Sequence, residues 1–154
     1  MKEFTLNFTG YYSDLHRDAI SEESGIYLVF VGKPLLNKTV NLEKLIYIGQ
    51  GENLKERICK HDKHDKFLQQ CEKGELPYYA YALVSKSELD IVENALIFYN
   101  KPCLNGDLTW HYNHTDSVRL SMSGQCHDLF GSTICIDVRT DGSVNAYAEE
   151  LVDE

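Results

Sequence analysis

Two short β-rich segments on either side of a polar loop constrain the fold of this 154-residue chain more than any other feature. Residues 26–31 and 45–48 consist of aliphatic and aromatic side chains, which favour strands. Gly32-Lys33-Pro34 ends the first segment. Because consecutive strands joined by a short loop pair antiparallel, the sequence predicts a β-hairpin here. A third strand is predicted over residues 78–84.

Each segment carries a tyrosine and a glycine at one end. The first segment follows Gly25 as Gly25-Ile26-Tyr27, and the second closes with Tyr47-Ile48-Gly49. Side chains alternate across a strand, so Tyr47 and Gly49 share one face. If the hairpin register places Tyr27 and Tyr47 on the same face of the sheet, both phenols converge. Gly49 has no Cβ atom and then allows the backbone to approach closely.

Helices are predicted after the second and third strands. Asn53 is placed to cap the first helix, with Glu56 three residues later. Arg57 and His61 are four residues apart, so one helical turn would stack their side chains on one surface. Glu93 lies off the centre of the apolar stripe of the second helix, where it can reach the edge of the sheet.

The net charge of −9 opposes nucleic-acid binding, but the charge is unevenly distributed. Residues 107–154 contain nine acidic and two basic side chains, whereas residues 1–106 contain fifteen acidic and thirteen basic ones. The stretch 53–73 is locally basic and is the predicted place for a phosphate. Its candidate nucleic-acid contacts are Lys55, Arg57, Lys60 and Lys63.

The two tripeptides, followed in order by Arg57, His61, Glu93 and Asn105, resemble the signature of the GIY-YIG nuclease family over roughly residues 24–106. The resemblance implies an α+β fold with a small, mainly antiparallel three-stranded sheet flanked by helices. Residues 1–106 would form this domain with an N-terminal extension, in which residues 4–8 are a candidate edge strand. Residues 107–154 would add an acidic β-rich segment packed on the same domain, with strands over 118–122, 133–138 and 144–147.

The resemblance also implies an activity, namely metal-dependent endonucleolytic hydrolysis of phosphodiester bonds, in DNA rather than RNA. Glu93 would hold one Mg²⁺ or Mn²⁺ ion, and Arg57 would contact the scissile phosphate. The family favours Tyr27 as the general base, while His61 is placed to accept the proton directly or from Tyr27.

Two further residues have expected supporting roles. Tyr47 would orient water or phosphate, and Asn105 would brace Glu93 or the neighbouring backbone. Structural alternatives remain open for several residues. The tyrosines can be ordinary strand aromatics, Arg57 can pair with Glu56 or Asp62, and Asn105 can be a turn residue.

Two other functions fit the same residues. One is a non-catalytic nucleic-acid or protein-binding module on this scaffold, and the other is a nuclease that cleaves RNA. Trp110 with Tyr112 is open to two interpretations, base stacking or a place in the core of the β-rich segment.

The composition indicates a cytoplasmic protein without membrane association. The five cysteines form no C-x-x-C pair, which predicts reduced thiols rather than disulfides. The longest apolar run, residues 26–31, is far shorter than a membrane span, and the N-terminus lacks a secretory signal pattern.

Overall fold

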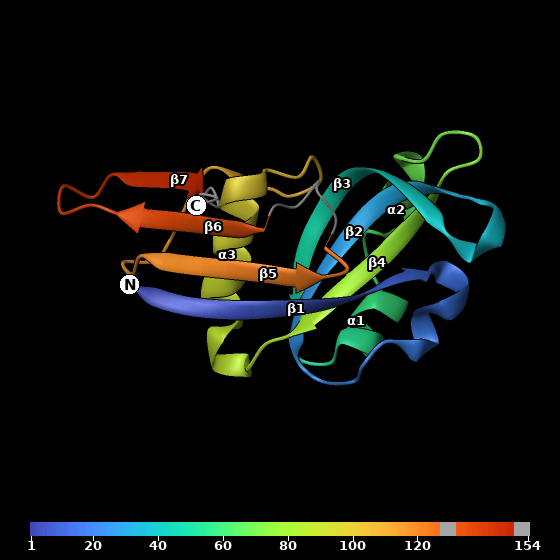
Figure 1. The fold of residues 1–154 in the computed structure, drawn as a ribbon, viewed down its shortest axis with the longest axis horizontal. Coiled ribbons are helices and arrows are strands. Elements are labelled where there is room, and N and C mark those ends of the chain that lie inside the picture. The colour runs from blue at the N-terminus through green and yellow to red at the C-terminus, as the bar shows by residue number, and fades with distance from the viewer. Residues whose placement is uncertain (127–131, 150–154) are drawn as a thin grey trace, which may run out of the picture.

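The computed structural model describes residues 1–126 and 132–149 as a mixed α/β structure built on one seven-stranded sheet (Figure 1). The strand order is β3-β2-β4-β1-β5-β6-β7. Every helix in these two ranges is too short or too polar to traverse a membrane. The strands are β1 (Lys2–Ser13), β2 (Gly25–Pro34), β3 (Val40–Gly51), β4 (Leu76–Leu83), β5 (Val118–Gly124), β6 (Thr133–Val138) and β7 (Val144–Ala148), the α-helices are α1 (Leu54–Cys59), α2 (His64–Gln69) and α3 (Leu89–Asn100), and the short 3-10 turns are η1 (Asp14–Ala19), η2 (Leu36–Lys38), η3 (Lys86–Glu88) and η4 (Asp107–Thr109).

The predicted fold class, an α+β domain with a small three-stranded sheet, is wrong. β2 pairs antiparallel with β3 and with β4, as predicted, but the sheet continues through β1 to the three C-terminal strands. The pairing of β1 with β5 is parallel and runs from Lys2 beside Val118 to Phe8 beside Gly124. β6 and β7 pair antiparallel. The acidic segment therefore extends the sheet itself, and its residues 127–131 and 150–154 lie outside the described ranges.

β1 joins the two ends of this sheet instead of forming the predicted edge. Residues 2–8 pair with β5, whereas residues 9–13 pair with β4 across an irregular register. The alternation that predicted a strand is present, because Leu6 and Phe8 are buried while Asn7 is exposed. Alternation defines which face of a strand is buried but carries no information about its neighbours, which explains the error.

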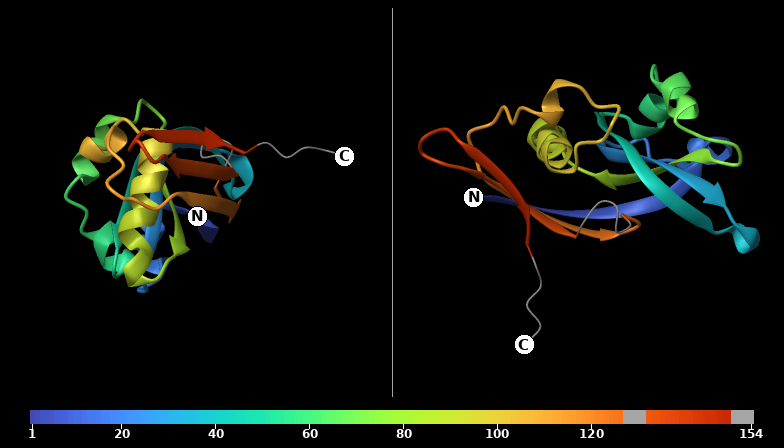
Figure 2. Two further views of the ribbon diagram at one scale, coloured as in Figure 1. Left: turned by 90° about the vertical axis from the view of Figure 1, so that its left-hand side faces the viewer. Right: turned by 90° about the horizontal axis from the view of Figure 1, so that it is seen from above.

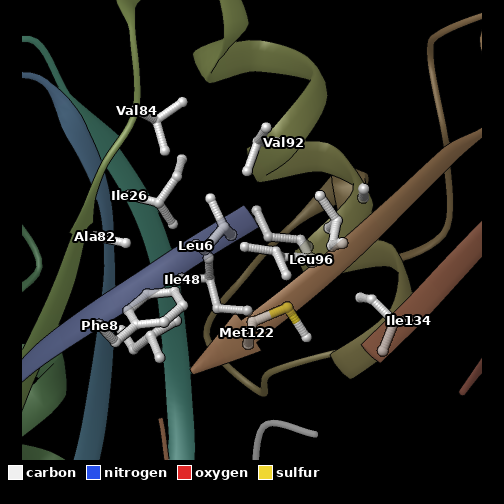
Figure 3. Close-up of a cluster of buried hydrophobic side chains, with 14 of the residues drawn as sticks. Leu6, Phe8, Ile26, Ile48, Ala82, Val84, Val92, Leu96, Met122 and Ile134 are labelled. Atoms are coloured by element: carbon white, nitrogen blue, oxygen red, sulfur yellow. The ribbon is translucent and has the colours of Figure 1, made fainter. Parts of the chain in front are cut away.

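Two hydrophobic clusters cover opposite faces of β2. Ile26 and Leu28 belong to the cluster under α3, whereas Tyr27 and Val29 belong to the cluster under α1 and α2. The sheet curves around α3 (Figure 2), so strands from both ends contribute to the first cluster. Figure 3 shows this cluster, with labelled side chains from both halves of the sheet and from α3: Leu6, Phe8, Ile26, Ile48, Ala82, Val84, Val92, Leu96, Met122 and Ile134.

The chain between β3 and β4 differs in part from its prediction. Asn53 caps α1 as predicted, because its Oδ1 accepts a hydrogen bond of 3.0 Å from the Glu56 backbone N–H. However, α1 ends at Cys59 and α2 begins at His64, so the single helix that would carry both Arg57 and His61 is absent from this described part of the chain. His61 lies in the turn between the two helices, where its side chain is buried beside Tyr27.

Candidate active site

Tyr27 lies at the centre of the site, and the glycine opposite makes room for it. The strand register pairs Tyr27 of β2 directly with Gly49 of β3. The phenol crosses over Gly49, so a Cβ atom at this position would overlap the Cζ and Oη atoms of Tyr27. The tyrosine of one tripeptide therefore requires the glycine of the other, as the sequence suggested.

The Tyr27 hydroxyl forms a 2.5 Å hydrogen bond with His61 Nε2 in the buried interior. The other ring nitrogen of His61, Nδ1, accepts a 3.0 Å hydrogen bond from the Lys63 backbone N–H. A neutral imidazole carries one proton, so this proton is on Nε2 and is donated to Tyr27 Oη. Burial lowers the pKa of His61 to about 4, and the Arg57 guanidinium acts in the same direction.

This arrangement changes the role expected for His61. A second proton on His61 would have to displace the Lys63 N–H from Nδ1, so the imidazole is a hydrogen-bond donor here and not a proton acceptor. Burial also holds the pKa of Tyr27 far above its ordinary value, because the charged phenolate would be poorly solvated. Tyr27 and His61 thus form a buried pair that neutral pH leaves uncharged.

Tyr47 is the tyrosine that reaches open space. Its ring centroid lies 6.1 Å from that of Tyr27 and 5.5 Å from that of His61. It lines an open cavity of about 190 Å³ together with Lys63, Glu93 and Asn105. Burial raises the pKa of Tyr47 and so does the negative charge of Glu93, whereas the Arg57 guanidinium and the Tyr27 hydroxyl lower it. Of the two phenols, Tyr47 is therefore the easier to ionise.

Glu93 reaches the sheet edge from α3, as predicted. Its Oε1 accepts a hydrogen bond of 3.2 Å from Gln50 Nε2 at the end of the edge strand β3, and the same amide donates to Asp90 at 2.8 Å. Burial raises the pKa of Glu93, whereas the positive charge of Arg57 lowers it. The Gln50 hydrogen bond also lowers this pKa, and the negative charge of Asp90 raises it.

No protein-family model, curated protein or solved structure matches this chain. Its function must therefore be inferred from the geometry of the site.

Asn105 braces the backbone and not Glu93. Its Oδ1 accepts a 3.0 Å hydrogen bond from the Ile48 N–H, and its Nδ2 donates at 2.9 Å to the Ile48 carbonyl. The side chain thus pairs with the edge strand as another strand would. It fixes the backbone between Tyr47 and Gly49, so Asn105 is a positioning residue.

Arg57 is held by an ion pair with Asp62, one of the two partners considered from the sequence. The Nη1 to Oδ1 distance is 2.9 Å, and this hydrogen bond holds the pKa of Asp62 below its ordinary value. Asp62 is well exposed, whereas Arg57 is partly buried against the tyrosines. A phosphate that binds Arg57 would have to share it with Asp62 or replace Asp62.

The three candidate lysines differ in their positions relative to the cavity. Only Lys63 among them lines it, with its ammonium 6.0 Å from the Tyr47 ring centroid. The other two form longer exposed ion pairs on the outer side of α1, Lys55 with Glu22 at 3.8 Å and Lys60 with Glu56 at 4.0 Å. Lys63 is thus the predicted nucleic-acid contact that the structure brings to the site.

The donor groups fit a single hard cation with a shell made mostly of water. Glu93 offers one carboxylate beside an open cavity. Asp90, one helical turn earlier, accepts a hydrogen bond from the same Gln50 amide. Within the described ranges, no three His, Cys, Asp or Glu side chains are grouped closely enough to enclose an ion. Mg²⁺ commonly uses one or two carboxylates and keeps several waters, which agrees with this set.

Three residues of the site were not assigned from the sequence. Gln50 follows the second tripeptide directly, and Asp90 precedes Glu93 by three residues, which is one helical turn. Both residues are polar and lie next to, or one helical turn from, a motif residue, and this proximity in sequence could have identified them. Asp62 was considered only as a competitor for Arg57.

Proposed function

We propose that this protein is a metal-dependent endonuclease that hydrolyses phosphodiester bonds, with DNA as the preferred substrate. The observation that carries the proposal is the cavity lined by Tyr47, Lys63 and Glu93, together with the Arg57 guanidinium, whose charge lowers the pKa of both Tyr47 and Glu93. These side chains combine an ionisable phenol, two cations and one carboxylate, and Asp107 adds a second carboxylate to the cavity lining. The resemblance to GIY-YIG nucleases depends on the two tripeptides, followed by Arg57, His61, Glu93 and Asn105, and not on the size of the sheet.

Phosphodiester hydrolysis builds up negative charge on the phosphoryl oxygens, which the site is equipped to offset. Arg57 offers a planar guanidinium to the scissile phosphate once Asp62 releases it, and Lys63 adds a second positive charge at the cavity. A divalent ion on Glu93 would supply further charge stabilisation when bound.

We assign the proton acceptor to Tyr47 and not to Tyr27. Tyr27 is fully buried, whereas Tyr47 lines the cavity where water and phosphate would lie. The attacking water would give a proton to the Tyr47 phenolate while its oxygen bonds to phosphorus. The phosphorus–oxygen ester bond breaks at the same time, and the leaving oxygen takes a proton from solvent. His61 donates to Tyr27, and Tyr27 in turn favours ionised Tyr47, so both act as positioning residues.

A cleavage assay tests the activity. Plasmid, linear duplex, branched DNA and RNA are incubated with the protein in Mg²⁺, in Mn²⁺ or in chelator, beside Glu93→Gln and Arg57→Ala. We expect cleavage that needs the metal and falls by about a hundredfold or more in each variant. Cleavage that survives both substitutions would overturn the proposal. RNA cleavage at the same rate would remove only the preference for DNA.

The pH dependence of cleavage distinguishes the candidate bases. With Tyr47 as acceptor, the rate should keep rising through neutral pH, because its pKa lies above the ordinary value of 10.0. With His61 as acceptor, the rate would be flat above about pH 5, since the His61 pKa is about 4. Tyr47→Phe should also lose more activity than Tyr27→Phe, and the reverse order would return the base to Tyr27.

A non-catalytic nucleic-acid-binding module is the second candidate. It is favoured by the Arg57–Asp62 ion pair, because the guanidinium that would stabilise a scissile phosphate is already engaged. Binding of nucleic acid without cleavage under all the metal conditions would support it.

A further inference from the structure

Trp110, the only tryptophan of the chain, is exposed at the surface. It follows η4 directly, and 70% of its surface is accessible to solvent. The expectation that it belongs to the core is therefore wrong. A large aromatic side chain in water needs another explanation, and its surroundings supply one.

The loop that carries Trp110 is held in place by a buried amide. Asn94 of α3 is 1% exposed and donates from Nδ2 to the His111 carbonyl at 2.8 Å. Its Oδ1 accepts a 2.8 Å hydrogen bond from the Asn113 N–H. Asn94 is the direct neighbour of Glu93, so one helical segment positions both the carboxylate and this loop. Such fixation lowers the entropy lost when a ligand binds.

One face of the Trp110 ring is occupied by a cation. Lys101 Nζ lies 4.7 Å from the Trp110 ring centroid and 4.5 Å from that of Phe98. The same ammonium donates a 2.7 Å hydrogen bond to the Thr109 carbonyl. The lysine therefore orients the indole, and the high exposure of Trp110 leaves the opposite face of the ring to solvent.

The Trp110 loop also forms walls of the candidate active site. Asp107 and Leu108 line the cavity that contains Tyr47 and Glu93. A second open cavity of about 260 Å³ lies between Glu93, Leu108 and Asn113. Lys101, at the end of α3, follows Glu93 by eight residues, which corresponds to about 12 Å along the helix axis. This distance corresponds to a few nucleotides along a nucleic-acid strand that passes the site.

We infer that Trp110, backed by Lys101, is a stacking site for an unpaired nucleobase next to the bond that is cleaved. This inference rests on the proposed nuclease function and narrows its substrate to nucleic acid with a single-stranded part near the cut. In a duplex the bases stack on one another, so only an unpaired base can offer its face to the indole. Arg57 is paired with Asp62, and Lys63 is the one candidate lysine that lines the cavity, so few cations are available for phosphate contacts and stacking is the more important contribution.

Because Trp110 is the sole tryptophan, its fluorescence reports on this site alone. The protein is titrated in chelator with single-stranded oligothymidylate and with a blunt duplex of equal length. We expect saturable quenching by the single strand and little quenching by the duplex. Equal quenching by both, or none by the single strand, would overturn the inference.

Fluorescence anisotropy of labelled single-stranded oligothymidylate, recorded in chelator, measures how much Trp110 contributes to binding affinity. Trp110→Ala should weaken binding by about tenfold or more, and Trp110→Phe by less, because the phenyl ring still stacks. Leu36→Ala, which removes an 88% exposed apolar side chain in η2 between β2 and β3, is the matched control and should bind as the wild type does. Circular dichroism verifies that each variant is folded. Wild-type affinity in Trp110→Ala would overturn the inference.

Failure of the stacking-site inference can be distinguished from failure of the nuclease proposal. Glu93→Gln should lose cleavage but keep the Trp110 quenching, because the stacking site does not include the carboxylate. If cleavage requires Glu93 while Trp110→Ala binds normally, the stacking site is wrong and the nuclease stands. If quenching and the Trp110→Ala loss are both observed but no substrate is cleaved, the nuclease proposal alone is wrong.

Discussion

The two ends of the sheet are stabilised in different ways. At the β2–β3–β4 end, buried polar groups such as Tyr27 and His61 are joined by hydrogen bonds. At the β5–β6–β7 end, the buried side chains, among them Leu120 and Ile134, are apolar, and the charges lie at the surface. β1 and α3 contact both ends.

This difference shows where the molecule has concentrated its polar chemistry. A buried hydrogen-bond network has few alternatives of equal energy, so it fixes the tyrosines and His61 in one arrangement. Apolar packing is not directional and contributes stability without setting the position of any reactive group. The C-terminal strands can therefore support the site mechanically, while its reactive side chains come from the other end and from α3.

The largest expected effect tests whether the two ends fold as one unit. Leu120 of β5 is fully buried in the cluster that also contains Ile26 and Leu96. Leu120→Ala should lower the free energy of unfolding by about 4 kcal/mol, because it leaves a cavity in this shared core. Urea unfolding followed by circular dichroism and by Trp110 fluorescence should give coincident transitions. Two separate transitions would mean that the ends are independent domains.

The polar end should be sensitive to acid in a way that the apolar end is not. The pKa of His61 is about 4 in the folded protein and near 6.5 when unfolded, so the unfolded chain binds the extra proton in the window between these values. Stability should therefore fall as the pH drops from about 6.5, with a loss of about 3 kcal/mol from His61 at pH 4. The free energy of unfolding measured against pH tests this.

His61→Gln is the control for this pH dependence. Glutamine does not titrate, so the variant should show a shallower loss of stability between pH 6.5 and 4 than the wild type. An identical slope in both proteins would show that His61 is not responsible.

Two glycines offer a matched test of backbone tolerance. Gly49→Ala places a methyl group against the buried Tyr27 phenol and should cost about 2 kcal/mol together with the activity. Gly142 lies between β6 and β7 at φ +88°, and no atom of the described residues comes within 4 Å of the place that a Cβ would take. Gly142→Ala should therefore cost only about 1 kcal/mol from the left-handed backbone. Thermal unfolding and cleavage assays compare the two. Equal loss of activity in the two variants would contradict the proposed difference between the two ends of the sheet.

The smallest effect concerns two arginine–carboxylate pairs, Arg57 with Asp62 and Arg119 with Glu149. Asp62→Asn frees Arg57 at the site and removes a negative charge, so single-stranded DNA should bind about threefold more tightly at low salt. Glu149→Gln removes the same charge at the other end and should leave binding unchanged. Equal gains in both variants would indicate a general effect of net charge.

Local sequence was sufficient to predict the elements around the site. The β2–β3 hairpin, the Asn53 cap of α1 and the reach of Glu93 to the sheet edge were all expected and are all observed. These features depend on residues that are close in sequence or on the facing of a single helix, so periodicity and capping rules apply directly.

Contacts outside regular helices and strands decided the rest of the site. Whether Asn105 braced Glu93 or the backbone depended on the position of Ile48, 57 residues earlier. The tautomer of His61 was set by a contact close in sequence, with the Lys63 N–H two residues later, but this contact exists only because α1 stops at Cys59. Periodicity and capping rules predicted neither contact.

The sequence by itself determined which segments form strands and where α1 begins, and it indicated the side chains that we propose act on a phosphate. Only the tertiary structure decided that β1 joins two halves of one seven-stranded sheet, that His61 donates to Tyr27, and that Trp110 is exposed on the loop whose Asp107 and Leu108 line the cavity. The physical reason is that alternation and capping are properties of neighbouring residues. Strand partners, the acceptor for the His61 proton and side-chain exposure are set by groups that the chain brings together from distant positions.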